Sequence, residues 1–260
     1  MLPQDAAHRD CCHHVDSSLV SGYIETPWSK IFKARGKGPD ARMAGAELYQ
    51  YYWQPVFLMA RRSGRARHEA EDLVNELALH IVEHGALATL DPARGRFRDW
   101  LKAAFKNFLL SEVRYHDAKK RGSAYLKISI DEIDREEQWA LAAASRTPDE
   151  VYDCRFARQL LGRALDRVKA EYWAEHRGDW YEQLKGTLTG RKLGYEQLSR
   201  QLGVPEGTLR KRADALRGRY DRSLNEEILS VIADTVDPDE ERRVLHTVLA
   251  GCTHDGQEAP

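Results

Sequence analysis

Long apolar runs are missing from this sequence of 260 residues. None approaches the roughly 18 apolar residues that a membrane-spanning helix requires, and the first residues, MLPQDAAHRDCCHH, lack the apolar segment of a secretory signal. We therefore expect a cytoplasmic protein that does not insert into a membrane. Cysteine is also scarce: Cys11, Cys12, Cys154 and Cys252 form neither a disulfide framework nor a CxxC pair, and we expect no function of them.

Signatures of catalysis are missing as well. No glycine-rich phosphate loop follows a strand pattern, and no nucleophile, base and orienting group stand at a recognisable catalytic spacing. These absences predict a protein that is not an enzyme and that needs no cofactor. Charged residues make up 31% of the chain and apolar residues 42%, which is typical of a globular protein with room for two modest domains.

The most informative stretch that is present runs from residue 97 to residue 122. Its apolar residues recur at helical spacing and predict one buried stripe, made of Phe97, Trp100, Leu101, Ala104, Phe105 and Phe108. Arg98, Lys102 and Lys106 repeat every four residues and share a flank beside that stripe. Residues 94–122 hold nine basic and three acidic side chains, whereas the whole chain has a net charge of −1. Such segregation favours binding to a phosphate backbone, although a core helix with a solvated basic face has the same pattern.

A second informative stretch, residues 193–220, has the layout of a helix-turn-helix. Leu198 and Leu202 lie on its first helix, and Gly203 provides the turn. The inner face of its second helix consists of Leu209, Ala213, Leu216 and Tyr220. The outward positions, which can reach phosphates and base edges in a major groove, are Thr208, Arg210, Lys211, Arg212, Asp214 and Arg217. A packed helical hairpin without nucleic acid is the alternative interpretation.

The remaining segments also predict helices, so we expect an all-α fold. Helical patterns follow a cap at Thr26, occupy residues 42–62 with a kink at Pro55, and occupy the acidic residues 68–84. Thr147-Pro148-Asp149-Glu150 is a typical capped helix start. Two further helices are expected at residues 224–236 and 240–249.

Composition divides the chain into two helical domains. We expect a flexible N-terminal extension at residues 1–25, a domain at residues 26–122, an acidic linker at residues 123–146, a domain at residues 147–223 and a C-terminal helical extension at residues 224–260.

Together these motifs resemble a bacterial sigma factor of the sigma-70 family, of the two-domain extracytoplasmic-function (ECF) type, over about residues 26–236. Asp72-Leu73-Val74-Asn75-Glu76 is similar to the family's Asp-Leu-x-Gln-Glu signature in region 2. Phe97-Arg98-Asp99-Trp100-Leu101, followed by Asn107, is similar to its Phe-Arg-x-Trp-Leu and Asn pattern. The helix-turn-helix falls where the family places region 4. The sequence departs from the family pattern at Asn75, Ala78 and Ser199, where Gln, an aromatic residue and Ala are usual.

The resemblance implies a sigma factor that binds core RNA polymerase, directs it to promoters through the −35 and −10 elements, and assists DNA melting. Residues 26–122 then form region 2, and residues 147–223 form region 4. The implied polymerase contacts are Asp72, Leu73, Glu76 and Leu77. The implied contacts with the −10 element are Arg94, Arg96, Arg98, Trp100, Lys102, Lys106, Asn107, Arg114, Lys119, Lys120 and Arg121. The −35 element is assigned to the outward residues of the helix-turn-helix. The implied partners are core RNA polymerase and promoter DNA, with an anti-sigma factor or other regulator as a further candidate.

Two other functions stay open at this point. The side chains of Glu76, His80, Glu83 and His84 suggest a metal enzyme built on a helical bundle, since the two histidines are four residues apart. The N-terminal cluster of His8, Cys11, Cys12, His13 and His14 is a second metal candidate. A solvated acidic face and ordinary surface composition explain these groups, so we expect no metal. The runner-up function is a helix-turn-helix regulator that binds operator DNA as a dimer, independently of polymerase.

Overall fold

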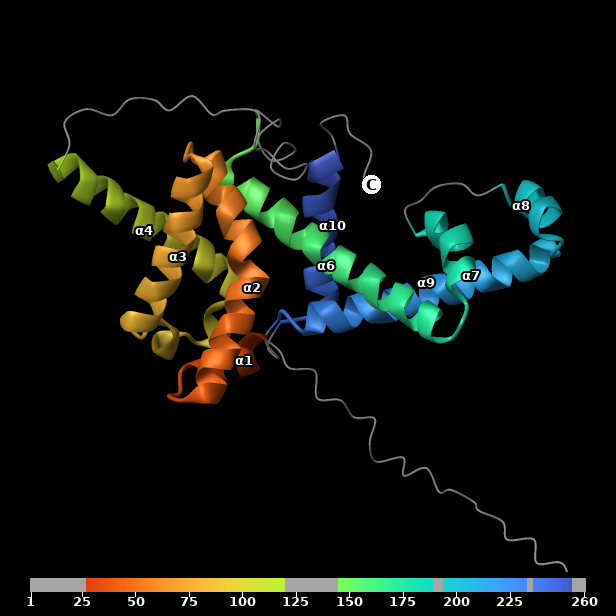
Figure 1. The fold of residues 1–260 in the computed structure, drawn as a ribbon, viewed down its shortest axis with the longest axis horizontal. Coiled ribbons are helices and arrows are strands. Elements are labelled where there is room, and N and C mark those ends of the chain that lie inside the picture. The colour runs from red at the N-terminus through yellow and green to blue at the C-terminus, as the bar shows by residue number, and fades with distance from the viewer. Residues whose placement is uncertain (1–26, 120–144, 189–193, 233–235, 254–260) are drawn as a thin grey trace, which may run out of the picture.

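The computed structural model describes residues 27–119, 145–188, 194–232 and 236–253. All regular structure in these ranges is helical, which confirms the all-α prediction. Figure 1 shows α2, α3 and α4 in a group on the left and α7 and α8 on the right, with α6 and α9 running between the two. The described helices include none that combines the length and the apolarity needed to cross a bilayer.

The bounds of the elements follow the sequence patterns closely in the first half of the chain. That half forms α1 (Pro27–Ala34), α2 (Pro39–Arg62), α3 (Arg67–Glu83), the short 3-10 helices η1 (Ala86–Thr89) and η2 (Pro92–Arg94), and α4 (Phe97–Lys119). The second half forms α6 (Pro148–Ala174), α7 (Gly178–Leu184), the 3-10 helix η4 (Lys185–Thr187), α8 (Tyr195–Leu202), α9 (Glu206–Leu229) and α10 (Pro238–Thr253).

Local chemistry explains where α6 begins. The Glu150 backbone N–H donates to the Thr147 hydroxyl oxygen at 3.3 Å, and the Thr147 N–H donates to the Glu150 carboxylate at 2.7 Å. This reciprocal pair is the capping box that the sequence predicted, and it satisfies backbone donors that the helix itself leaves unpaired. Pro55 lies within α2, which continues on both sides of it.

One hydrophobic core joins the N-terminal helices to a distant part of the chain. Ile31 of α1, Leu58 of α2 and Phe105 of α4 are fully buried there. Phe156 of α6 lies in the same core, stacked on Tyr52 of α2 with 5.9 Å between the ring centroids. Because burial of each large apolar side chain contributes roughly 1.5–3 kcal/mol, this core holds the first half of α6 firmly against α2.

A second core lies at the other end of α6. Val168 of α6 packs there with Leu184 of α7, Leu198 of α8 and Leu209 of α9. With 27 residues, α6 is about 40 Å long at 1.5 Å per residue, so its two halves serve different cores. The predicted boundary between the domains at residues 123–146 lies almost wholly outside the described residues, and it stays a prediction.

The C-terminal region differs from the prediction. Residues 206–229 form one continuous helix, α9, where a separate helix was expected to begin at Leu224. The buried residues Leu216, Leu224 and Ile228 recur at multiples of four, and no proline interrupts them, so one apolar stripe runs through the expected break. The predicted helix at residues 224–236 is therefore wrong as a separate element. The last helix, α10, also begins earlier and ends later than expected.

A disulfide corrects the expectation for the cysteines. Cys154 of α6 and Cys252 of α10 are bonded through their sulfur atoms, with 6.1 Å between their Cα atoms. They are 98 residues apart in the sequence, so spacing along the chain did not indicate that they meet. The pair fastens α10 to α6, and α10 also packs on α9 and places Leu245 in the first core (Figure 1).

Candidate functional site

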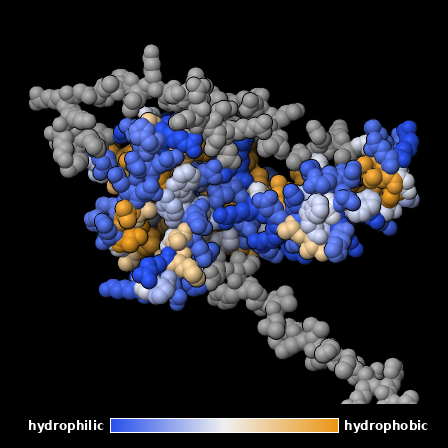
Figure 2. Space-filling model, viewed as in Figure 1, coloured by the Kyte–Doolittle hydropathy of each residue, from blue (hydrophilic) through white to orange (hydrophobic). Residues whose placement is uncertain are grey.

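The acidic helix α3 presents a mixed acidic and apolar face to solvent. Asp72 and Glu76 are exposed on it, and Leu79 and Val82 are 60% and 70% exposed. Figure 2 shows apolar surface at this end of the molecule, over the region of α3. Exposed branched aliphatic side chains beside carboxylates are typical of a protein-docking surface, because burying them is favourable while the charges select the partner. We call Asp72, Glu76, Leu79 and Val82 the docking face.

The sequence interpretation assigned polymerase contact to two residues that lie elsewhere. Leu73 and Leu77 are buried on the opposite side of α3, in the first core. They hold the helix in place, whereas the sequence interpretation missed Leu79 and Val82. Helical spacing was the available signal, since Leu79 and Val82 fall off the stripe formed by Leu73 and Leu77.

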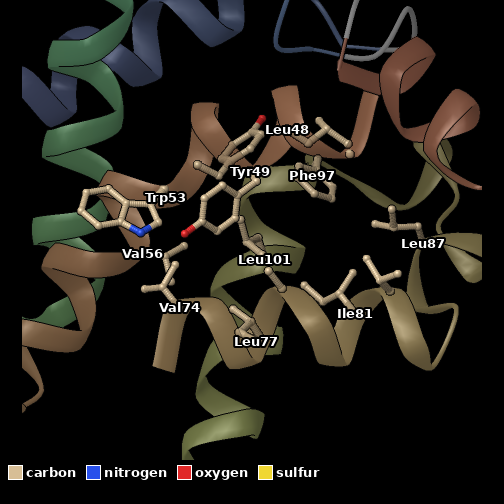
Figure 3. Close-up of a pocket in the computed structure, with 14 residues that line it drawn as sticks. Leu48, Tyr49, Trp53, Val56, Val74, Leu77, Ile81, Leu87, Phe97 and Leu101 are labelled. Atoms are coloured by element: carbon tan, nitrogen blue, oxygen red, sulfur yellow. The ribbon is translucent and has the colours of Figure 1, made fainter. Parts of the chain in front are cut away.

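Next to the docking face, α2, α3 and α4 line a small, partly open apolar pocket of about 100 Å³ (Figure 3). Leu77 and Ile81 of α3 line it from one side and Leu101 of α4 from another. Tyr49 of α2 lies at the same place and donates a hydrogen bond of 2.6 Å to the Asn75 side-chain oxygen. This bond ties α3 to α2 through the residue that replaces the usual Gln of the Asp-Leu-x-Gln-Glu signature.

The helix α4 buries the predicted apolar stripe. Phe97, Leu101, Phe105 and Phe108 are all buried in the first core. Trp100 is only partly buried and stacks on Phe97, with 5.4 Å between the ring centroids. Trp100 is therefore part of the packing at the start of α4, and its remaining exposed surface is the part available to a ligand.

The basic flank of α4 faces carboxylates of the same chain. The Lys102 Nζ atom lies 2.8 Å from Asp153 of α6, and the Lys106 Nζ atom lies 2.5 Å from Asp149 of α6. The paired numbers rise on α4 as they fall on α6, so the two helices run in opposite directions along this contact. The contact covers cations that the sequence assigned to the −10 element, namely Lys102 and, in part, Lys106.

The start of α4 is covered by α10. The Arg98 guanidinium donates two hydrogen bonds to the Glu241 carboxylate, one of them 3.2 Å long. The Arg96 Nε atom donates to the same carboxylate at 2.6 Å. Glu241 is fully buried and Arg98 is 7% exposed, so two guanidinium groups and one carboxylate form a network away from water. Glu240 adds an exposed contact of 3.4 Å to Arg96.

Electrostatics at Arg98 reflect this burial. Loss of solvation lowers the pKa of the Arg98 guanidinium, while the nearby charge of Asp99 acts in the opposite direction. A guanidinium stays protonated in proteins all the same, so the network with Glu241 is an ion pair. The sequence reasoning missed Glu240 and Glu241, and their place in the first turn of a helix was the only signal.

The other residues assigned to the −10 element divide into three groups. Arg94 and Asn107 are exposed, and Arg94 lies 3.7 Å from Asp91. Arg114 and Lys119 belong to the last turns of α4, and only their backbone is described. Lys120 and Arg121 lie outside the described residues.

The helix-turn-helix has the predicted geometry. Its first helix, α8, ends at Gly203, whose φ of 64° lies in the left-handed region that glycine adopts without strain. Leu209, Ala213 and Leu216 of α9 are fully buried in the second core, as expected from their spacing. Tyr220 is partly buried and packs against both cores.

The outward residues of α9 are not equivalent. Arg210, Lys211, Asp214 and Arg217 are exposed, and Thr208 is partly buried. Within the helix, Arg210 lies 3.4 Å from Glu206, and Arg217 lies 2.8 Å from Asp214. Surface pairs of this kind contribute under about 1 kcal/mol and exchange easily for phosphate contacts.

Arg212 has a different position from its neighbours. Its guanidinium lies over the Trp180 ring of α7, 3.5 Å from the ring centroid, and the side chain is partly buried. Its contact with Trp180 therefore ties α9 to α7.

The metal candidates acquire no third ligand within the described parts of the chain. The rings of His80 and His84 lie 4.1 Å apart, yet these residues include no group of three or more potential ligands that could hold an ion. The N-terminal cluster of histidines and cysteines lies outside the described residues.

Comparison with known proteins points to one family. No family model matches the chain, and no solved structure matches it. Over 218 residues the chain is 28% identical to the ECF RNA polymerase sigma factor SigE of Mycolicibacterium smegmatis, a match that covers 84% of this chain and 74% of that protein. This similarity spans both the docking face and the helix-turn-helix. The chain is thus similar, over most of its length, to an ECF RNA polymerase sigma factor.

Proposed function

We propose that this protein binds core RNA polymerase as a sigma factor and directs it to promoters, without catalysing a reaction itself. The observation that carries the proposal is the presence, in one chain, of an exposed acidic and apolar docking face on α3 and of a helix-turn-helix with exposed cations on α9. An operator-binding regulator needs the second feature only. The similarity to an ECF RNA polymerase sigma factor over most of the chain supports the same conclusion.

The docking face is assigned to polymerase. Asp72 and Glu76 supply charge for orientation, and Leu79 and Val82 supply apolar area that is buried on binding. This face carries no positive charge at these positions, so it is unsuited to DNA.

The helix-turn-helix is assigned to the −35 element. The first turns of α9 are the part of such a unit that enters the major groove. Arg210 and Lys211 stand there in exposed positions and can contact phosphates or base edges, and Arg217 can contact the backbone farther along.

The start of α4 and the loop before it are assigned to the −10 element. Arg94 and Asn107 are exposed, and Trp100 keeps part of its ring surface at the same end of the helix. Cations beside an aromatic surface can hold the phosphates and bases of a separated strand. The same assignment includes Arg96 and Arg98, which contact α10, and Lys102, which contacts α6.

Co-elution with bacterial core RNA polymerase on gel filtration tests the proposal. The wild-type chain should co-elute, and the Asp72→Ala/Glu76→Ala variant should not, because it loses the charges of the docking face. A matched control, Asp179→Ala/Glu182→Ala, removes two exposed carboxylates from α7 and should co-elute as the wild type does. Absence of co-elution for the wild type, together with tight binding of a stable dimer to palindromic DNA, would instead establish the operator-binding regulator.

A further inference from the structure

The helix α10 is fastened to the rest of the chain at both of its ends. Glu241 in its first turn is fully buried against Arg98 of α4 and Arg96, the residue just before α4. Cys252 in its last turn is bonded to Cys154 of α6. The two points are three helical turns apart, about 16 Å along the axis at 1.5 Å per residue. Between them Leu245 is buried in the first core.

A third contact strengthens the cysteine end. The Arg146 Nη2 atom, just before α6, donates a hydrogen bond of 2.6 Å to the Cys252 carbonyl oxygen and one of 3.4 Å to the Gly251 carbonyl oxygen. These carbonyls belong to the end of α10, where a helix has unpaired acceptors and a negative potential. The same contact places a positive charge beside Cys252.

The helix covers residues that the proposed function needs. With α10 in place, Arg98 is 7% exposed, between Glu241 and the Phe156 ring of α6, and Arg96 is already paired with two glutamates, so a phosphate would have to displace these carboxylates. Glu241 occupies them with a carboxylate, the same kind of anionic oxygen pair that a nucleic-acid phosphate presents. The covered state and the DNA-bound state of Arg96 and Arg98 are therefore mutually exclusive.

The bond that fastens α10 is chemically reversible. Both sulfur atoms belong to buried residues, with Cys154 4% and Cys252 3% exposed, but a recess lined by Cys154, Asp153 and Val248 opens next to them. A thiol reagent can approach through this recess. Positive charge near Cys252 favours the exchange, because it stabilises the thiolate that leaves when the reductant attacks the bond.

We propose that Cys154 and Cys252 form a redox-controlled modification site, at which a dithiol reductant releases α10 and uncovers Arg96 and Arg98 for the single strand of the −10 element. This inference rests on the proposed function, whose −10 surface it regulates. It is carried by the two-ended attachment of α10 and by the position of Glu241 on the cations that it covers.

The exchange balances in two steps. One thiolate of the dithiol attacks a sulfur of the Cys154–Cys252 bond, which breaks as a mixed disulfide forms and the other cysteine leaves as a thiolate. The second thiol of the reductant then attacks the mixed disulfide and releases the remaining cysteine. Two electrons and two protons pass from the dithiol to Cys154 and Cys252, and the reductant leaves as a disulfide.

Two measurements on the full chain test the site. Alkylation of the unfolded chain followed by mass spectrometry reports whether Cys154 and Cys252 are bonded after treatment with oxidised glutathione and free after treatment with dithiothreitol. Fluorescence anisotropy with a labelled single-stranded oligonucleotide of random sequence then compares the two forms. The reduced form should bind the oligonucleotide about tenfold more tightly. Its affinity should also fall more steeply with salt concentration, by an amount that corresponds to about two more phosphate contacts, those of Arg96 and Arg98.

Variants distinguish the effect of the Cys154–Cys252 bond from effects of the other cysteines. Cys252→Ser should bind the oligonucleotide as the reduced form does, with or without oxidant. The matched control Cys11→Ser/Cys12→Ser leaves the proposed pair in place and should keep the full response to oxidant. In Glu241→Gln, oligonucleotide binding should depend less on oxidant. Arg96 and Arg98 lack the buried carboxylate in this variant, so they are available for phosphate even while the disulfide is intact.

The outcomes distinguish this inference from the proposed function. If the disulfide does not form under oxidant, or if oxidised and reduced chains bind the oligonucleotide equally, the redox site is overturned while co-elution with polymerase still stands. If neither form co-elutes with polymerase, the proposed function fails, and a redox response in oligonucleotide binding would show only that α10 covers a cationic surface.

Discussion

Glu241 and Arg98 form a buried ion pair across 143 residues of sequence, and the pair joins the last helix to the helix that carries the basic flank. Arg96 shares the same carboxylate at 2.6 Å. A buried pair of this kind adds little net stability when intact, but removal of one partner leaves a charge without its counterion. The contact therefore makes the position of α10 sensitive to a single residue.

Substitution of Glu241 should loosen α10. Removing one partner of a buried ion pair costs about 3 kcal/mol or more, and each 1.4 kcal/mol is about a factor of ten in an equilibrium constant. We therefore expect amide hydrogens of α10 to exchange about a hundredfold faster in Glu241→Gln than in the wild type, measured by hydrogen exchange and mass spectrometry. The matched variant Glu240→Gln removes only an exposed contact to Arg96 and should change exchange little. Equal effects of the two variants would contradict the buried network.

Neighbouring cations of α9 should have different effects when replaced. Lys211→Ala should lower the salt dependence of DNA binding by about one phosphate contact and leave stability unchanged, because Lys211 is exposed. Arg212→Ala should reduce the free energy of unfolding by about 0.5–2 kcal/mol, because it removes the contact with Trp180. Binding titrations at several salt concentrations and urea denaturation measure the two quantities. A larger binding defect in Arg212→Ala than in Lys211→Ala would show that the outward face of α9 is oriented differently.

Two glycines of the helix-turn-helix region should respond in opposite directions to alanine. Gly203 has a φ of 64°, so Gly203→Ala should destabilise the protein by about 1–2 kcal/mol. Gly218 lies within α9 with no atom close to an added Cβ, so Gly218→Ala should stabilise it by about 0.5–1 kcal/mol. Chemical denaturation of both variants provides the comparison. A destabilised Gly218→Ala would indicate that α9 is not a continuous helix at this point.

The cap of α6 should make the free energy of unfolding depend on pH in the acidic range. The backbone N–H of Thr147, together with its hydroxyl, holds the pKa of the Glu150 carboxyl below its ordinary value of 4.5. A lowered pKa in the folded state means that the contribution is present above pH 4.5 and is lost as the pH falls through the folded-state value. The wild type should therefore lose more stability than Glu150→Gln between about pH 5 and pH 3, by less than about 1 kcal/mol because the group is exposed. Denaturation curves at both pH values measure the difference, and parallel losses in the two proteins would exclude the cap as the source.

Local patterns were sufficient for most of the helices. The spacing of Phe97, Leu101 and Phe105 predicted the buried stripe of α4, and Thr147 with Glu150 predicted the start of α6. The turn at Gly203 was predicted for the same reason, since only the local backbone decides it. Each of these features depends on residues within a few positions of one another, which is the range over which helical periodicity and capping act.

The candidate site was only partly predictable. Asp72 and Glu76 were expected on the exposed face of α3 and lie there, whereas Leu73 and Leu77 are in the core. Helical spacing separates Leu79 and Val82 from the stripe of Leu73 and Leu77, but spacing alone does not show that no other helix covers them. In the structure Leu79 and Val82 are 60% and 70% exposed.

The sequence by itself determined that the protein is helical, where its turns and caps lie, and which motifs relate it to sigma factors, because these properties depend on neighbouring residues. Only the tertiary structure decided the partners of the basic flank and of the cysteines. Glu241 reaches Arg98, and Cys252 reaches Cys154, because α10 packs against α6 and α9, which brings its first turn to the start of α4. Contacts between residues so far apart in the chain depend on how whole helices pack, and no local pattern encodes that.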